Sequence, residues 1–259
     1  MSECIQQVFQ TGFDVLQRIR DTQMPALEEA SRLVAQAFLA GRSFFVSGSG
    51  HSHTLAEEFY GRAGGLAFVK PILTSELTLT EHPTKSSYVE RLQGYASILA
   101  DLYHVGEGDV VLVASNSGRN AYPVELARTS KERGASVVAL TSVAHSNSTP
   151  SRDESGLHLL DVADVVIDNC GVPGDAALRL EGVGPAVCPT SSMANAFVAQ
   201  AITVEVTRLI RDAGEVPPVF VSLNSQGTEH AAGCEPGGRP LCSCAVRPRW
   251  QALLAARRG

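Results

Sequence analysis

The chain has 259 residues, of which 44% are hydrophobic and 19% charged, a balance typical of a soluble globular protein. Its formal net charge of -6 argues against nucleic acid or an anionic membrane surface as the main partner. A phosphorylated metabolite remains compatible with this charge, because a few local hydrogen-bond donors can outweigh the global field.

Targeting and membrane signals are missing from the sequence. No stretch reaches the 18 or so continuous apolar residues of a membrane span, and the first residues lack the basic start and apolar core of a signal peptide. We therefore expect a cytoplasmic protein. In that reducing compartment the six cysteines, which have no framework spacing, are predicted to be free thiols.

The first forty residues predict two helices. In the first, apolar residues from Ile5 to Ile19 recur at steps of three and four and make one apolar face that includes Val8, Phe9 and Phe13. The second carries Pro25 in its first turn and ends at Gly41.

Short apolar runs separated by helical stretches follow. Most of these runs are unbroken rather than alternating, which is typical of parallel strands buried on both faces. Alternation of strand and helix predicts right-handed βαβ units and a doubly wound α/β fold with a parallel sheet. We expect its five strands in the order 2-1-3-4-5, the order that would place the loops after the first and third strands at the switch point where ligands bind. Pro71 places the second strand at an edge or ends it there. The predicted strands are 43–47, 66–73, 109–115, 136–142 and 164–169, and the predicted helices between them are 52–63, 87–104, 119–133 and 190–213.

The composition changes after Gly227. Residues 228–259 are rich in Gly, Pro, Arg and Cys and show no sustained period, so we expect one domain over 1–227 followed by a poorly ordered tail. Cys234, Cys242 and Cys244 lie in this tail with His230 nearby, but their spacing does not match a zinc site. No metal and no cofactor is predicted.

Two loops rich in Gly and Ser follow the first and third predicted strands, at 48–53 (GSGHSH) and 115–120 (SNSGRN). Each leads into a helix N-terminus, and together they offer backbone N–H groups, hydroxyls and a positive dipole end to an anion. We call these two loops the phosphate cradle. Ser117 or Asn120 could instead cap the next helix. The first loop matches neither a Walker loop nor a dinucleotide fingerprint.

At these residues the chain resembles the SIS (sugar isomerase) domain family, over about residues 2 to 225. The specific pieces are GSGHSHTLAEEFYGRAGG, SNSGRNAYPVELA and ALTSVAHSNS. The resemblance implies a five-stranded parallel sheet, a homodimer or homotetramer, and a phosphorylated sugar as ligand. It places on the phosphate the side chains of Ser52, Ser115, Ser117 and Asn120, with Asn116 between them through its backbone N–H and with Gly118 in the same loop.

Isomerising an aldose to a ketose requires a base that moves a proton between adjacent carbons. Glu57 and Glu58 lie on the helix after the first loop, and the resemblance agrees with an acid there. The two point about 100° apart, so one of them serves and the other is solvated. We favour Glu58. His51 is a further candidate, as an acid or as a phosphate contact.

Other residues of the strand-end loops are candidates for contact with the sugar. Asp175 could hold a sugar hydroxyl, or belong to an ordinary Gly-Asp turn. The others sit in the first loop, in the long loop after the second strand, or after the fourth strand, and they are Gly50, His53, His82, Lys85 and His145.

One departure affects the mechanism. The sugar-phosphate isomerases that the chain resembles often carry a histidine on the late helix, whereas here the helix at 190–213 has none and Glu205 lies too far along it. The second acid–base group is therefore unassigned. We expect a phosphosugar-binding protein that is an isomerase. The alternatives are a lyase or etherase acting on N-acetylmuramate phosphate, and a non-catalytic sensor. A DNA-binding regulator is disfavoured, since no basic helix-turn-helix precedes the domain.

Overall fold

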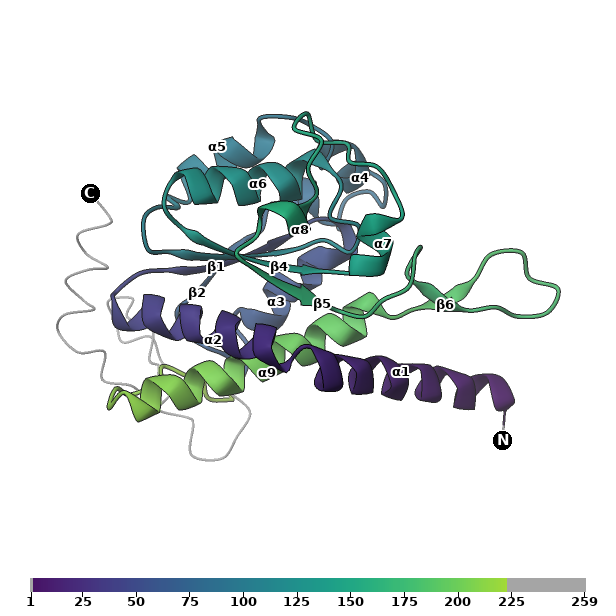
Figure 1. Cartoon of the computed structure of the whole chain (residues 1–259), viewed down its shortest axis with the longest axis horizontal. Helices are drawn as coiled ribbons and strands as arrows, with labels where there is room; N and C mark the ends of the chain where they lie inside the picture. The colour runs from purple at the N-terminus through teal and green to yellow at the C-terminus, as the bar shows by residue number, and fades with distance from the viewer. Residues whose placement is uncertain (1, 223–259) are drawn as a thin grey trace.

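The computed structural model describes residues 2–222, and its order of elements matches a doubly wound α/β domain (Figure 1). The parallel sheet has the order β2-β1-β3-β4-β5, which confirms the predicted topology. Its strands are β1 (Phe44–Gly48), β2 (Val69–Ile72), β3 (Val110–Ala114), β4 (Ser136–Thr141) and β5 (Val165–Asp168).

Helices cover both faces of the sheet because its strands are apolar on both sides. One face packs against α1 (Glu3–Thr22), α2 (Met24–Leu39), α3 (Thr54–Phe59) and α9 (Ser191–Asp212). The other packs against α5 (Tyr95–Leu102), α6 (Ala121–Glu132) and α8 (Leu159–Val162). Successive strand residues face opposite layers: Phe44 and Val46 lie in the first core, and Phe45 lies in the second.

Two predicted elements are shorter than expected. The second strand does not begin at residue 66, because Gly64 and Ala67 donate backbone hydrogen bonds to the segment 218–220 instead of to β1. Pro71 lies in β2 at the sheet edge, as the sequence indicated. The helix predicted over 52–63 is a 3₁₀ turn, Gly50–His53, followed by the six residues of α3.

The helix predicted over 87–104 is in fact two. The first, α4 (Lys85–Val89), ends where Glu90 turns towards the sheet, and α5 begins only at Tyr95. The sequence also did not predict the 3₁₀ turn Ser75–Leu77, the short helices α7 (Val143–Asn147) and α8, or the antiparallel hairpin of β6 (Ala176–Leu178) and β7 (Val187–Pro189). These elements are too short for hydrophobic periodicity to reveal.

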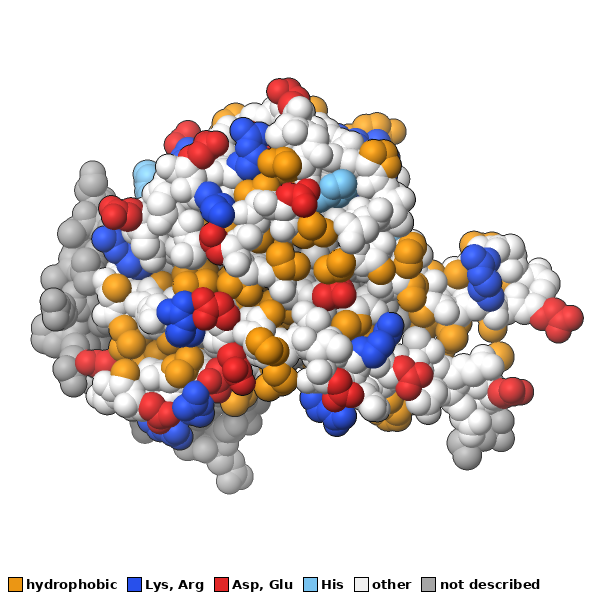
Figure 2. All heavy atoms as spheres, in the orientation of Figure 1, with side chains coloured by type: hydrophobic (Ala, Val, Ile, Leu, Met, Phe, Trp, Pro, Cys, Tyr) orange, Lys and Arg blue, Asp and Glu red, His pale blue; other side chains and the backbone are white. Residues whose placement is uncertain are grey.

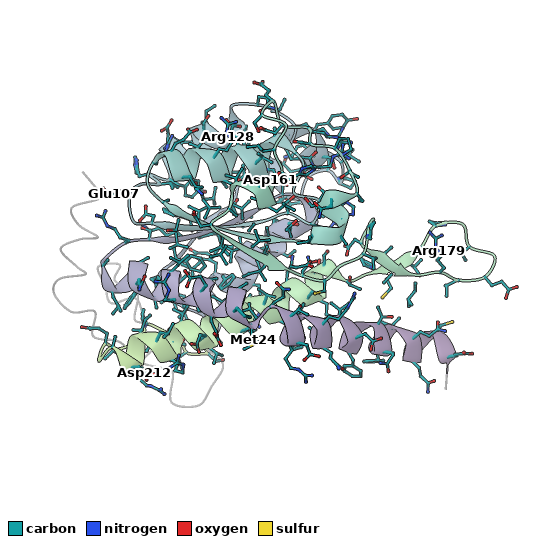
Figure 3. All side chains as sticks on the ribbon, viewed as in Figure 1. Met24, Glu107, Arg128, Asp161, Arg179 and Asp212 are labelled. Atoms are coloured by element: carbon teal, nitrogen blue, oxygen red, sulfur yellow. The ribbon has the colours of Figure 1, made fainter. Side chains whose placement is uncertain are left out.

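The first half of α1 and the β6–β7 hairpin project together from the body of the molecule (Figure 1). We call them the arm. Figure 2 shows the arm as a separate part of the surface that carries hydrophobic and charged side chains, and Figure 3 places Arg179 at the hairpin. The predicted apolar face of α1 is buried only towards its end, at Val15 and Ile19, whereas Phe9 and Phe13 remain 62% exposed. The first half of this apolar face is therefore left uncovered by the other residues of 2–222.

The structure also bears on the predictions about membrane spans and cysteines. No helix among residues 2–222 is both long and apolar enough to cross a membrane. Cys4, Cys170 and Cys188 are free thiols, while Cys234, Cys242 and Cys244 and the 227/228 boundary lie outside the described residues.

Candidate functional site

The two loops of the phosphate cradle lie side by side. Strands β1 and β3 are neighbours, and their last paired residues are Gly48 and Ala114, so both loops start at the same level of the sheet. In an open parallel sheet, ligands bind outside the carboxyl ends of the strands, next to the point where the strand order reverses. The predicted site residues of both loops are therefore brought together.

The loop after β3 keeps several donors unused. Ser115 Oγ accepts the N–H of Gly118 at 3.2 Å. The backbone N–H groups of Ser117, Arg119 and Asn120 have no acceptor among residues 2–222. Unpaired N–H groups at a helix start, here that of α6, attract anions.

Gly118 sets the path of this loop. Its φ is +57°, and an added Cβ would lie 3.3 Å from Thr141 Oγ1, Ser146 Oγ and Leu159 Cβ. A larger residue would therefore be strained and crowded at once. Asn120 occupies the N-cap position of α6 but makes no capping hydrogen bond, which leaves its amide for other partners.

Asn116 is hydrogen-bonded to neighbouring segments of the chain. Its carbonyl oxygen accepts the N–H of Ser142 at 3.1 Å, and its Oδ1 accepts Asn169 Nδ2 at 2.9 Å. Asn169 Nδ2 also reaches Asn195 Oδ1 on α9 at 3.2 Å. This chain of amides fixes the β3 loop to the β4 and β5 loops and to α9, so the loop is rigid before any ligand arrives.

The loop after β1 wraps tightly onto its own strand. A Cβ on Gly48 would lie 2.4 Å from the carbonyl oxygen of Ser52, a separation that no side chain tolerates. Ser52 donates its N–H to the carbonyl of Ser49 at 3.1 Å. The N–H groups of Gly50 and His51 have no acceptor within residues 2–222, and the His51 side chain is exposed.

The two carboxylates of α3 have different surroundings. Glu57 is 54% exposed and lies 3.4 Å from Nε2 of the buried His53, whose Nδ1 is hydrogen-bonded to the carbonyl of Gly50. Glu58 is 24% exposed, and its Oε1 contacts Arg62 and Gln200 Nε2 of α9. Glu57 is thus linked to the β1 loop through His53, whereas Glu58 faces α9.

A third carboxylate, absent from the sequence-based candidates, contacts both loops. Glu90 Oε2 accepts Ser49 Oγ at 2.5 Å, and Glu90 Oε1 accepts Asn120 Nδ2 at 2.7 Å. Burial raises the pKa of this carboxyl. Ser86, one turn earlier on α4, is buried with its hydroxyl unpaired among the described residues. No local sequence signal marks Glu90, because the contact depends on how the segment between β2 and β3 folds back.

Arginines add positive charge beside the cradle. Arg152 donates its backbone N–H to the carbonyl of Arg119 at 2.7 Å and its Nη1 to Asn120 Oδ1 at 3.2 Å. Burial lowers the pKa of Arg119, and the nearby positive charges of Arg152 and Arg91 lower it further. None of the three forms an ion pair with a carboxylate among residues 2–222.

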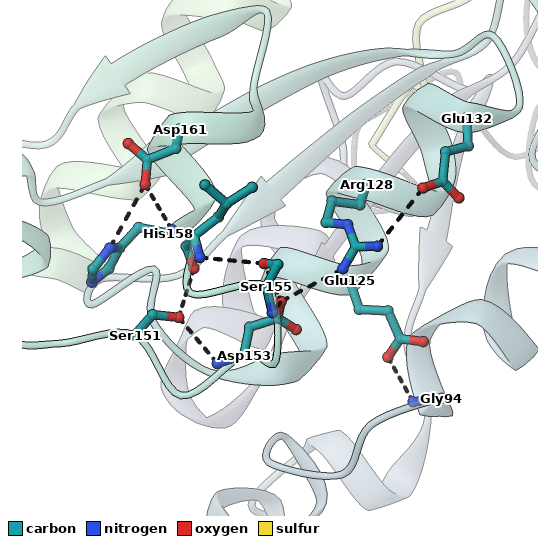
Figure 4. A network of polar contacts seen from close by, with 10 residues as sticks. Gly94, Glu125, Arg128, Glu132, Ser151, Asp153, Ser155, His158 and Asp161 are labelled. Atoms are coloured by element: carbon teal, nitrogen blue, oxygen red, sulfur yellow. Dashed lines mark hydrogen bonds and ion pairs between the residues drawn. The ribbon is translucent and has the colours of Figure 1, made fainter.

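The loop that carries Arg152 is held by its own polar network (Figure 4). The Asp153 carboxylate accepts the N–H of Ser155 at 3.0 Å and lies 3.7 Å from Arg128 Nη1 of α6. Ser151 Oγ accepts the N–H of Asp153 at 3.0 Å. Arg152 is thereby presented to the β3 loop by a pre-ordered segment.

His145 and Asp175 lie near each other beyond β4. His145 Nδ1 accepts the N–H of Gly174 at 2.6 Å, so this nitrogen carries no proton, and burial lowers the pKa of the ring. The ring is then neutral with Nε2–H as a donor. The Asp175 carboxylate accepts Ser191 N at 2.9 Å and Ser191 Oγ at 2.6 Å, which caps the start of α9.

The two candidates in the β2–β3 segment are less engaged with the cradle. His82 is exposed, and its Nδ1 accepts Thr84 N at 3.2 Å. Lys85 Nζ pairs with Glu81. Neither side chain is hydrogen-bonded to a cradle residue within residues 2–222.

Curated relatives align with most of this chain. A UPF0309 protein of Halalkalibacterium halodurans is 44% identical over 215 residues, which cover 83% of this chain and 89% of that protein. A UPF0309 protein of Thermoanaerobacter pseudethanolicus is 42% identical over 218 residues, 83% of this chain and 88% of that protein.

Solved structures show the same fold at low sequence identity. A phosphoheptose isomerase from Neisseria gonorrhoeae aligns with a TM-score of 0.55 and 18% identity, covering 80% of this chain and 98% of that one. A phosphoheptose isomerase from Francisella tularensis gives 0.55 and 15%, covering 80% and 100%. The SIS domain family model matches residues 9–142, which include the first four strands and both cradle loops. With this match and these relatives, the chain belongs to the SIS domain family.

Proposed function

We propose that this protein binds a phosphorylated sugar or amino sugar in the phosphate cradle and isomerises it between aldose and ketose. The observation that carries the proposal is a set of backbone N–H groups at the carboxyl ends of β1 and β3 that have no acceptor within residues 2–222, those of Gly50, His51, Ser117, Arg119 and Asn120. A phosphate dianion matches that set better than a neutral sugar does, because charge-assisted hydrogen bonds are the stronger ones. The phosphoheptose isomerases of the same fold support a sugar phosphate as the ligand class.

The proposed phosphate ligands are the side chains of Ser52, Ser115, Ser117 and Asn120, with the backbone of Asn116 and Gly118 in the same loop. The sugar would then extend past Gly50 towards His51, His53 and His145. The proposed base is Glu57 or Glu58. The contacts favour Glu57, since its partner His53 belongs to the cradle, whereas Glu58 is hydrogen-bonded to α9.

The test replaces two hydroxyls of the β3 loop. Ser115→Ala with Ser117→Ala should weaken sugar phosphates by about 1.5–3 kcal/mol per lost hydrogen bond to the charged group. Calorimetry against heptose, hexose and amino-sugar phosphates measures this, and Ser97→Ala on α5 serves as a control. Unchanged affinity would remove the loop from the site. Binding without conversion of any sugar would leave a sensor, and release of lactate from N-acetylmuramate phosphate would reveal the etherase.

We also propose that the protein is a cytoplasmic homodimer or homotetramer. Its support is the apolar face of the arm, where Ile5, Val8, Phe9 and Phe13 are exposed on successive turns of α1. An isolated helix face of this kind gains free energy by packing against a second copy.

A further inference from the structure

Glu90 joins the two loops of the cradle. Its two carboxylate oxygens each accept one hydrogen bond, from Ser49 Oγ of the β1 loop at 2.5 Å and from Asn120 Nδ2 of the β3 loop at 2.7 Å. Its carbonyl oxygen accepts the N–H of Tyr122, in the first turn of α6, at 2.9 Å. Among the carboxylates that the structure describes, it is the one bonded to both loops.

The charges around Glu90 come from two segments. Arg91 follows it in the chain, and Arg152 reaches across from the loop beyond α7, and both stabilise the ionised carboxylate. Arg119, on the β3 loop, faces the same two arginines. Burial acts in the opposite direction and outweighs them, so the pKa of Glu90 is already raised without a ligand.

A phosphate in the cradle would compete with Glu90 for the same donor. Asn120 is a proposed phosphate ligand, yet its Nδ2 donates to the Glu90 carboxylate. A dianion bonded to this loop would place a second negative charge beside a part-buried one, an arrangement that favours the protonated carboxyl. A proton on Oε1 of Glu90 would release Asn120 Nδ2 and supply an O–H that can itself donate to the anion, while Oε2 would still accept the hydrogen bond of Ser49 Oγ.

We propose that Glu90 is a positioning residue of the phosphate site, which aligns Ser49 and Asn120 and takes up one proton when a phosphate group enters the cradle. This inference rests on the proposed function, because it needs an anion at the two loops. The proton comes from solvent and forms one O–H bond on the carboxylate, and no other covalent bond changes.

The experiment counts protons on binding. Sulfate is the probe, because its charge does not change near neutral pH. It is added to the protein in unbuffered solution at constant ionic strength, and the proton uptake is measured with a pH-stat at a series of pH values from about 5 to 8.5. The wild type should take up as much as about one proton per bound sulfate, and sulfate should bind more tightly as pH falls.

The variants separate Glu90 from other groups. Glu90→Gln should bind sulfate with little proton uptake and with a flat dependence of affinity on pH, whereas Glu132→Gln, an exposed change at the far end of α6, should behave as the wild type. Ser49→Ala keeps the carboxylate but removes one hydrogen bond that lowers its pKa, so the uptake maximum should move to higher pH. This variant also gives a test if Glu90→Gln does not fold.

The outcomes distinguish the two proposals. Sulfate binding without proton uptake, or with equal uptake in Glu90→Gln, would overturn the role of Glu90 and leave the phosphate site standing. A protein that binds neither sulfate nor any sugar phosphate would overturn the proposed function itself. A merely structural role for Glu90 would lower the stability of the variant without changing the number of protons taken up.

Discussion

The phosphate cradle and the arm differ in the polarity of their surfaces and in how their side chains are held. The cradle is polar, and its side chains are held by contacts from several segments: the amides of Asn116 and Asn169, and the carboxylate of Glu90. The arm is apolar along α1, and Phe9 and Phe13 contact each other but remain exposed. Side chains of the cradle thus have hydrogen-bond partners within this chain, whereas the apolar side chains of the arm have no cover among residues 2–222.

The largest expected effect concerns chemistry at the cradle. Glu57→Gln should lower turnover of the sugar phosphate by about 10²- to 10⁴-fold with little change in its dissociation constant, because a general base acts mainly in the transition state. Exchange of the C2 proton into deuterated water, followed by NMR, measures this step. Glu58→Gln is the matched variant one residue along. A large loss in Glu58→Gln beside a normal Glu57→Gln would show that the carboxylate facing α9 is the base.

The next largest effect is expected on self-association, when charged side chains replace apolar ones on the arm. Phe9→Asp combined with Phe13→Asp should weaken self-association by about 10²-fold or more, since burying each ring contributes about 1.5–3 kcal/mol. Analytical ultracentrifugation measures the change, while ligand binding by each monomer should persist. Leu102→Asp alters an equally exposed side chain on α5 and should leave the assembly intact. An unchanged assembly in the double variant would mean that the arm is not the interface.

A smaller effect is expected at His145. Because burial lowers its folded-state pKa, the folded protein binds this proton less readily than the unfolded chain does. The free energy of unfolding should therefore fall as pH drops below about 6.5, the ordinary pKa of histidine. NMR titration of the His145 ring should give a midpoint below that value, and a midpoint above it would contradict the neutral donor assigned here.

The smallest effect should come from the tail. Ending the chain after Gly227 should move the melting temperature by no more than about 2 °C, because residues 228–259 offer no periodic apolar face to bury. Calorimetry of the two proteins checks this, with ultracentrifugation to test the assembly. A large loss of stability, or of self-association, would show that the tail packs as an element of its own.

The parallel sheet was predictable from the sequence. Unbroken apolar runs separated by helical segments indicated strands buried on both faces of a doubly wound sheet, and the structure has the expected strand order. The same pattern placed Ser115–Asn120 and Gly48–His53 at the carboxyl ends of neighbouring strands. The local sequence is enough to predict the position of these loops, because each loop directly follows its strand.

The side chains that meet at those loops could not be predicted from the sequence. Glu90 reaches Ser49 and Asn120 across 41 and 30 positions of sequence, and Arg152 reaches Asn120 across 32. Nothing in the spacing of residues encodes such contacts, since they depend on where α4 and the loop after α7 fold back over the sheet. Likewise, periodicity revealed the apolar face of α1, but only the packed structure showed that its first half finds no cover within residues 2–222.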